Sequence, residues 1–156
     1  MKKKVFIDGR EGTTGLRIYD RLAVREDIEL IVLPENERKS YAARKNAINS
    51  SALSFLCLPD DAARESVEMC ENPDTVIIDT STAHRTDERF VYGFPELSES
   101  QARAVASSKR IAVPGCHACG FIALVKPLAD AGIISKSAHI SCFSLTGYSG
   151  GGKKTI

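Results

Sequence analysis

The chain has 156 residues, 43% hydrophobic and 26% charged, which is the balance of a globular protein with one proper core and excludes fibrous and disordered classes. The 21 Lys and Arg residues nearly balance the 20 Asp and Glu residues, so the net charge of +1 predicts no nucleic-acid partner and no anionic membrane surface. The basic residues 2–4 lead only into the apolar run Val5–Ile7, which is too short for a signal peptide or a membrane span.

Apolar runs alternate with helical patterns along the first two thirds of the chain. Strands are predicted at residues 5–8, 28–33, 53–58, 75–79 and 110–113, and helices at residues 13–24, around 41–47, from Asp60 or Asp61 to Asn72, and at 98–106. Strands that are apolar throughout and alternate with helices are typical of a parallel sheet covered on both faces. The sequence therefore predicts an α/β fold, a doubly wound Rossmann-like domain over residues 1–113.

Two of these helices carry capping signals at their first residues. Ser98 and Gln101 have the spacing of a capping box, in which the serine side chain accepts from the N–H three residues on. Asp60 or Asp61 is expected to cap the helix after the third strand. Residues 92–97 have no clear period, so no element is predicted there.

Residues 114–156 differ in character from the preceding domain. A strongly apolar helix is predicted at residues 120–131 and a strand at 139–145, followed by a glycine-rich segment. These elements are expected to begin a second, α+β domain.

Three glycines lie between the first strand and the first helix. Gly9, Gly12 and Gly15 are spaced G-x-x-G-x-x-G, at the point where a dinucleotide pyrophosphate meets backbone N–H groups and a helix amino terminus. The candidate cofactor residues of this loop are Gly9, Arg10, Gly12, Thr13, Thr14 and Gly15. The alternative is a tight turn with a purely structural role.

Charged residues follow the second strand. An acidic residue at this point would bind a ribose diol, whereas the basic pair Arg38 and Lys39 favours a 2′-phosphate. The predicted cofactor is therefore NADP(H), and a solvated charged loop is the alternative.

Five cysteines, an odd number, in a chain with no predicted export signal indicate reduced thiols and a cytoplasmic protein. Cys116 follows Pro114 and Gly115 and precedes the apolar helix, and helix amino termini favour the thiolate that attacks an acyl carbon to form a thioester. The alternative is a small core residue, as many cysteines are.

Two other functions use the same cysteine. Cys116 and Cys119 have the spacing of a thiol-disulfide pair, and together with His139 and Cys142 they imitate the spacing of a zinc-bearing interaction module. On a strand, His139 and Cys142 would point to opposite faces, which opposes a shared metal, so no metal ligands are assigned.

Several ordered segments resemble one known family. They are residues 8–16 (DGREGTTGL), 56–64 (LCLPDDAAR), 79–85 (DTSTAHR), 92–97 (YGFPEL), 114–116 (PGC) and 147–152 (GYSGGG). Together they resemble the short-type N-acetyl-gamma-glutamyl-phosphate reductases, which are related to aspartate-semialdehyde dehydrogenases.

The resemblance implies NADPH-dependent reduction of N-acetyl-glutamyl 5-phosphate, a small-molecule acyl phosphate, to the 5-semialdehyde in arginine biosynthesis. Cys116 would be the catalytic nucleophile. The residues implied to contact cofactor are Pro59, Gly150 and Gly151, and Ser149 is implied to contact substrate. Ser81 and Arg85 lie at the mouth of the predicted sheet, where an anion would bind, and are the other candidate substrate residues; the alternative for Arg85 is a solvated loop residue.

The same resemblance implies that residues after 113 begin a substrate and dimerisation domain that continues past Ile156 and carries an acid/base histidine. The complete protein is then expected to be a homo-oligomer, and this chain alone is expected to be inactive. Around the cysteine, Val113, His117 and Cys119 stand where the family pattern has Asn, Tyr and Thr, which affects the shape of the pocket.

Overall fold

The structure, a computed structural model, describes residues 2–10, 12–135 and 137–147 and divides the chain into two compact units, Met1–Pro114 and Gly115–Ile156. The strands of the first unit are β1 (Lys3–Asp8), β2 (Ile28–Ile31), β3 (Leu53–Leu56), β4 (Val76–Asp79), β5 (Val91–Tyr92) and β6 (Arg110–Ala112). Its α-helices are α1 (Thr13–Ala23), α2 (Tyr41–Ser50), α3 (Asp60–Met69) and α4 (Glu99–Ser107), with short 3-10 helices at Glu35–Glu37 and Pro95–Leu97. The second unit begins with α5 (Cys116–Asp130).

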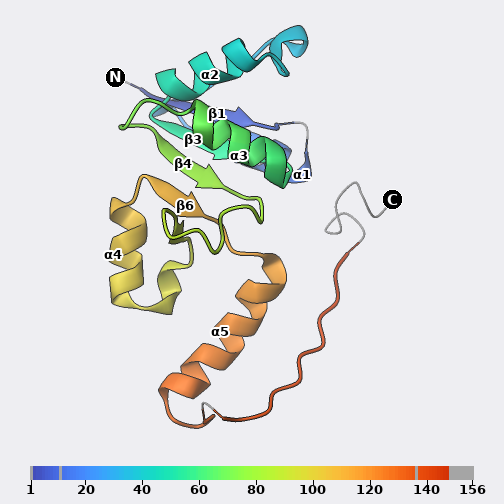
Figure 1. Ribbon diagram of the computed structural model, residues 1–156, viewed down its shortest axis with the longest axis vertical. Coiled ribbons are helices and arrows are strands. Elements are labelled where there is room, and N and C mark those ends of the chain that lie inside the picture. The colour runs from blue at the N-terminus through green and yellow to red at the C-terminus, as the bar shows by residue number, and fades with distance from the viewer. Residues whose placement is uncertain (1, 11, 136, 148–156) are drawn as a thin grey trace. The chain divides into compact units, whose positions relative to one another are not determined.

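The six strands form one sheet in the order β2-β1-β3-β4-β6-β5, and every pair is parallel (Figure 1). The predicted α/β class and the Rossmann-like parallel sheet are thus confirmed. The chain leaves β1 toward β2 on one side and later returns to β3 on the other, so β1 and β3 flank the point where the strand order reverses. In open α/β sheets, ligands bind at the carboxyl ends of the strands beside this point.

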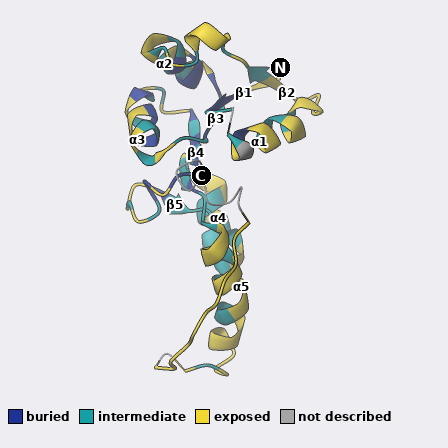
Figure 2. Cartoon of the chain, turned by 90° about the vertical axis from the view of Figure 1, so that its right-hand side faces the viewer, coloured by how far each residue is buried: buried dark blue, intermediate teal, exposed yellow. Residues whose placement is uncertain are grey.

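Helices cover both faces of the sheet. α2 and α3 lie on one side of β1 and β3, and α1 lies on the other side (Figure 2). This separation follows from right-handed crossovers, because the chain moves across the sheet in opposite directions before and after β2. β1 is therefore covered on both faces, and its residues Val5, Phe6, Ile7 and Asp8 are all buried.

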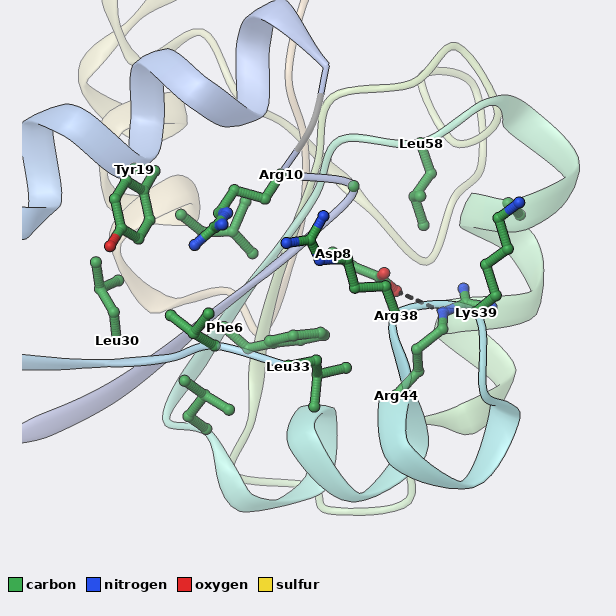
Figure 3. A pocket seen from close by; sticks show the side chains of 15 residues that line it. Phe6, Asp8, Arg10, Tyr19, Leu30, Leu33, Arg38, Lys39, Arg44 and Leu58 are labelled. Carbon is green, nitrogen blue, oxygen red and sulfur yellow. Dashed lines mark hydrogen bonds and ion pairs between the residues drawn. The ribbon is translucent and has the colours of Figure 1, made fainter. Parts of the chain in front are cut away.

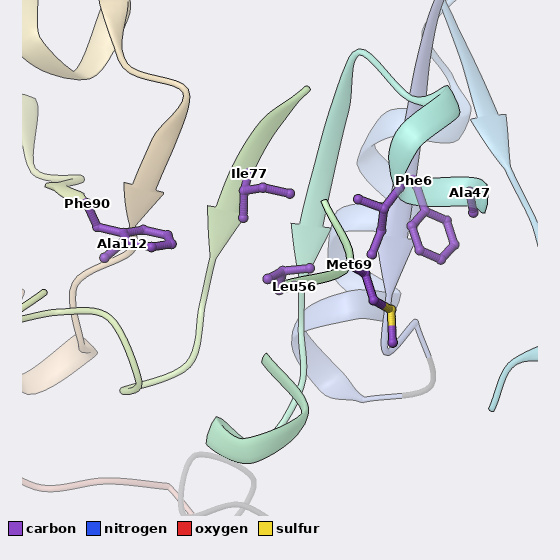
Figure 4. Packing of buried hydrophobic residues seen from close by; sticks show 8 residues of the cluster. Phe6, Ala47, Leu56, Met69, Ile77, Phe90 and Ala112 are labelled. Carbon is purple, nitrogen blue, oxygen red and sulfur yellow. The ribbon is translucent and has the colours of Figure 1, made fainter. Parts of the chain in front are cut away.

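The core lies between the sheet and the helices that cover it. Ile48 of α2, Leu56 of β3, Met69 of α3 and Ile77 of β4 are each 0% exposed and belong to one cluster with Phe6 (Figure 4). The apolar runs that predicted the strands supply this packing, since the strands they form are buried from two sides.

The two capping predictions have different outcomes. Ser98 precedes α4, and its Oγ accepts from the N–H of Gln101 at 3.0 Å, which confirms the serine half of the capping box. The Gln101 side chain does not complete the box, because it donates to the carbonyl of Tyr92. The predicted aspartate cap is wrong. Pro59 precedes α3, and Asp60 lies in the first turn with its carboxylate occupied by the N–H and hydroxyl of Thr82, at 2.9 and 2.5 Å.

The strand β5 was not predicted, because two residues are too short to show a period. Val91 and Tyr92 pair with Ile111 and Ala112 at the edge of the sheet, so β5 is recognised only by its neighbour.

The second unit differs from prediction at two points. α5 begins at Cys116, four residues before the predicted start at Gly120, because Gly115 serves as N-cap and its carbonyl accepts from Cys119 N at 2.9 Å. The strand predicted at residues 139–145 is wrong: these residues are in neither strand nor helix. A strand needs a partner for its backbone groups, and the described part of this unit offers none.

None of the helices among the described residues is long and apolar enough to cross a membrane.

The packing predicts that Leu56→Ala lowers the free energy of unfolding by about 2–5 kcal/mol, because it leaves a cavity at a site with 0% exposure. Val24→Ala, at a side chain that is 81% exposed, is the control and should change it by less than about 0.5 kcal/mol. Urea denaturation followed by circular dichroism measures both. Equal effects of the two substitutions would contradict the assigned core.

Candidate cofactor pocket and candidate nucleophile

The glycine turn after β1 is shaped by close backbone contacts. Gly9 has φ of +83°, and a Cβ there would lie 2.2 Å from the carbonyl oxygen of Cys57, which follows β3. A Cβ on Gly15 would lie 2.5 Å from the carbonyl oxygen of Gly9. Both positions therefore require glycine for the turn itself.

Gly12 is different, because a Cβ there would find only the Gly9 carbonyl oxygen, at the ordinary contact distance of 3.7 Å. Gly12 is also the N-cap of α1, and no side chain caps this helix start. Open space over an uncapped helix amino terminus fits the approach of an anion such as a phosphate.

A cavity of ≈ 310 Å³ lies beside this turn, at the low end of the range for small-molecule sites. β1, β2 and the segments after them supply most of its wall (Figure 3). Apolar side chains such as Leu30, Leu33 and Leu58 line part of it, and Arg10, Arg38 and Lys39 bring positive charge. The structure thus brings four sequence-predicted cofactor residues, Gly9, Arg10, Arg38 and Lys39, to one cavity.

Arg10 packs against α1. Its Cζ lies 4.7 Å from the ring centroid of Tyr19, a cation–π contact, and both side chains line the cavity (Figure 3). The contact thus joins two side chains of the cavity wall, one cationic and one aromatic.

Asp8 and Arg44 line the cavity and belong to a polar cluster that the sequence did not predict. Arg44 of α2 donates from Nε to Asp8 Oδ2 at 3.2 Å, from Nη1 to Glu65 Oε2 at 2.7 Å and from Nη2 to Ser66 Oγ at 2.7 Å. Ser66 donates in turn to Asp8 Oδ2 at 2.9 Å. Arg44 and Asp8 are 8% and 4% exposed. The one sequence signal was a charged residue, Asp8, closing an apolar strand.

Burial raises the pKa of the Asp8 carboxyl, against the opposing effects of Arg44 and of the Ser66 hydroxyl. Burial also opposes the charge on Arg44, but Asp8 and Glu65 more than offset it, so the pKa of the guanidinium is raised and Arg44 remains a cation. The cluster therefore keeps a positive charge next to Asp8 at the cavity wall.

The segment after β4 contains a second buried polar cluster. His84 Nδ1 lies 2.7 Å from Asp79 Oδ2, and the His84 ring stacks on Phe90 with centroids 4.3 Å apart. Ser81 donates to the same Asp79 oxygen at 2.7 Å and accepts from Ala83 N at 3.1 Å. The side chain of Ser81 thus shapes this segment.

Arg85 in the same segment is half-buried, and its Nε donates to the carbonyl oxygen of Val113 at 3.1 Å. Pro59 lies exposed between β3 and α3. Substrate contact by Ser81 and Arg85, and cofactor contact by Pro59, remain predictions, while Ser149, Gly150 and Gly151 lie outside the described residues.

The candidate nucleophile lies in the second unit. Cys116 is exposed and is the first residue of α5, so the predicted placement at a helix amino terminus is confirmed. It lines a groove of ≈ 510 Å³ between α5 and residues 140–147, with apolar walls from Phe121, Leu124 and Phe143. His117 Nδ1 and the Ser144 hydroxyl form a hydrogen bond across the start of this groove.

The alternative functions gain nothing from this geometry. Within the ranges the structure describes, no three His, Cys, Asp or Glu side chains are grouped so that they could hold a metal ion. Cys116 and Cys119 are both free thiols.

A parallel sheet with a close glycine turn at its reversal point and a cationic cavity beside that turn defines a dinucleotide-binding Rossmann domain. Residues 4–105 match the family model described as "Semialdehyde dehydrogenase, NAD binding domain". The chain belongs to this family, so its cofactor is a nicotinamide dinucleotide.

Relatives of known name support the same family. N-acetyl-gamma-glutamyl-phosphate reductase from Chelativorans sp. (strain BNC1) is 50% identical over 156 residues, which is 100% of this chain and 50% of the relative. N-acetyl-gamma-glutamyl-phosphate reductase 2 from Pseudomonas putida is 50% identical over 152 residues, 97% of this chain and 49% of the relative. The resemblance seen in the sequence is confirmed, and the chain spans about half the length of the curated relatives it matches.

Solved structures show the same fold at low identity. Aspartate semialdehyde dehydrogenase II from Vibrio cholerae, complexed with ASA, aligns with a TM-score of 0.64 and 17% identity, over 84% of this chain and 43% of that one. Aspartate semialdehyde dehydrogenase with NADP from Candida albicans aligns with a TM-score of 0.54 and 17% identity, over 82% of this chain and 47% of that one.

The environments of the cysteines predict their order of alkylation at near-neutral pH. Cys116 should react first, because it is exposed at a helix start, and Cys57 last, because burial raises the pKa of its thiol to about 11. Iodoacetamide labelling with peptide mapping over time measures the order. Cys142 is the matched comparison, since it is exposed but lies outside any helix. Faster labelling of Cys142 than of Cys116 would contradict the role of the helix start.

Proposed function

We propose that this chain is the NADP(H)-binding half of an enzyme that reduces N-acetyl-glutamyl 5-phosphate to N-acetyl-glutamate 5-semialdehyde, with release of phosphate, in arginine biosynthesis. The observation that carries the proposal is 50% identity along the whole chain to a reductase named for this substrate. The glycine turn, the cavity and the helix-start cysteine are the parts that such a reaction needs.

The residues of the first unit fit a phosphorylated dinucleotide. The uncapped start of α1 and the open space over Gly12 would receive the pyrophosphate. Arg38 and Lys39, at the cavity beyond β2, would bind a 2′-phosphate, and the apolar side chains between them and α1 would contact the adenosine. When bound, the cofactor supplies a hydride.

Cys116 supplies the covalent step. Its thiolate attacks the acyl carbon, a sulfur–carbon bond forms, and the bond between that carbon and the phosphate oxygen breaks, which releases phosphate and leaves a thioester. Reduction of the thioester carbonyl then breaks the sulfur–carbon bond, so that the aldehyde leaves and the thiolate returns.

We further propose that the enzyme is cytoplasmic and that its second unit lies in an interface of a homo-oligomer. All five cysteines are free thiols, which suits a reducing compartment. Leu124, Phe143 and Leu145 are 73%, 88% and 83% exposed, and apolar side chains of this size are commonly covered by further protein surface.

Gly12→Val tests the cofactor site. The side chain would occupy the space over the helix start, so NADPH binding should weaken at least about tenfold, a loss of roughly 1.4 kcal/mol or more. Calorimetric titration measures the affinity, and circular dichroism confirms the fold. Gly120→Val is the matched control, since a Cβ at Gly120 also meets no close atom but lies in the second unit. Unchanged NADPH affinity in Gly12→Val would contradict the proposed position of the pyrophosphate over Gly12.

Replacing both Arg38 and Lys39 by Ala should weaken NADPH binding by about tenfold or more and NADH binding much less, because NADH lacks the 2′-phosphate that they would bind. Titration of the same protein with each dinucleotide gives the ratio of affinities. An equal loss for NADPH and NADH would show that these side chains do not select the phosphate.

A further inference from the structure

The buried pair Asp8–Arg44 occupies the wall of the cofactor cavity, and nothing in the proposed reaction yet uses it. Among the described residues that line this cavity, Asp8 is the one acidic side chain, whereas Arg10, Arg38, Lys39 and Arg44 are basic. Figure 3 shows the pair joined by its hydrogen bond, and Arg38 lines the same cavity.

A carboxylate at this place opposes the binding of a phosphate. Charges interact more strongly across a partly closed, low-dielectric cavity than in water. An unpaired Asp8 carboxylate would therefore repel a 2′-phosphate bound in the same cavity. Arg44 reduces this repulsion, because its Nε lies 3.2 Å from Asp8 Oδ2. Its second carboxylate partner, Glu65, has a side chain that is 48% exposed, so water screens that charge more than it screens Asp8.

Arg44 has partners besides Asp8. Its Nη1 donates to Glu65 of α3, a contact that does not involve Asp8, and its Nη2 donates to Ser66, which in turn donates to Asp8. Its backbone N–H donates to the carbonyl of Ser40, the residue directly after Lys39. Arg44 thus lies in the first turn of α2, the helix that begins directly after the segment carrying Arg38 and Lys39.

We propose that Arg44 is a specificity-determining positioning residue: as the counter-ion of Asp8, it allows the cavity to accept the 2′-phosphate of NADP(H) and so sets the preference over NAD(H). This inference rests on the proposed cofactor site. It concerns the Asp8–Arg44 ion pair in the cavity wall, whereas Arg38 and Lys39 would bind the phosphate directly.

Two substitutions that alter the same ion pair separate this role from a structural one. Arg44→Met removes the positive charge beside Asp8 from the cavity wall and should lower the ratio of NADPH to NADH affinity by about tenfold. Asp8→Asn keeps the size of the side chain, removes the negative charge and should raise that ratio. A pair that only held the fold together would shift the ratio in the same direction in both variants, or in neither.

Calorimetric titration of the 156-residue chain with NADPH and with NADH measures each ratio. Lys45→Met is the matched control, because Lys45 follows Arg44 on α2 and also forms an ion pair. Its Nζ lies 2.6 Å from Glu71 Oε1, and the Glu71 side chain is 69% exposed. The ratio of NADPH to NADH affinity should not change in this variant. A fall in the ratio for Asp8→Asn, or a shift in Lys45→Met as large as that in Arg44→Met, would overturn the inference.

Removing one partner of a buried pair can prevent folding. If Arg44→Met does not fold, Arg44→Lys replaces it. This variant keeps the positive charge beside Asp8, so its ratio of NADPH to NADH affinity should stay near that of the unmodified chain. A tenfold fall in the ratio would overturn the inference. The proposed function has a separate outcome, because it fails if the unmodified chain binds neither dinucleotide. If that chain prefers NADPH and the variants do not shift in opposite directions, the role of Arg44 alone is wrong.

Discussion

The parallel pairing of β1 with β2 on one side and with β3 on the other is the constraint on which the candidate cofactor site depends. It places the end of β1 beside the end of β3, where Cys57 N donates to the carbonyl of Asp8 at 2.8 Å. The chain can turn there only because Gly9 has no side chain, since a Cβ would meet the Cys57 carbonyl. The turn then directs the start of α1 toward the same edge of the sheet, so the space over Gly12 and the neighbouring cavity follow from backbone pairing.

Two clusters of buried polar side chains lie at this edge, and each holds a segment that follows a strand. Asp8 with Arg44 and Ser66 joins β1 to α2 and α3, and Asp79 with His84 and Ser81 holds the segment after β4. Buried polar groups need partners to offset their lost hydration. The partners of Asp8 come from distant helices, whereas those of Asp79 lie in the segment that directly follows it. The hydrogen bonds therefore fix where the loops lie, while the apolar cluster around Leu56 and Ile77 supplies the driving force for packing.

The chemistry that the family resemblance implies is divided between the two units. The first unit carries the dinucleotide site, and the second carries Cys116 at the start of α5. The groove beside Cys116 has apolar walls with few charges, which suits a surface to be covered by more protein, whereas the cavity of the first unit is rich in cations and suits a phosphorylated ligand. In the proposed reaction, each unit would thus supply features for a different step.

The sequence by itself determined what depends on neighbours along the chain. Alternating apolar runs specified the strands and helices of the first unit, glycine spacing specified the turn after β1, and the hydroxyl of Ser98 specified the start of α4. The tertiary structure decided whatever needs a distant partner. The two-residue β5 exists because β6 lies beside it, residues 139–145 are not a strand because no described neighbour pairs with them, and the aspartate expected to cap α3 binds Thr82 instead. Arg44 and Asp8 are 36 residues apart, so no local pattern could reveal that they meet. Local propensity acts within a few residues, but strand pairing and buried ion pairs depend on which segments the fold brings together.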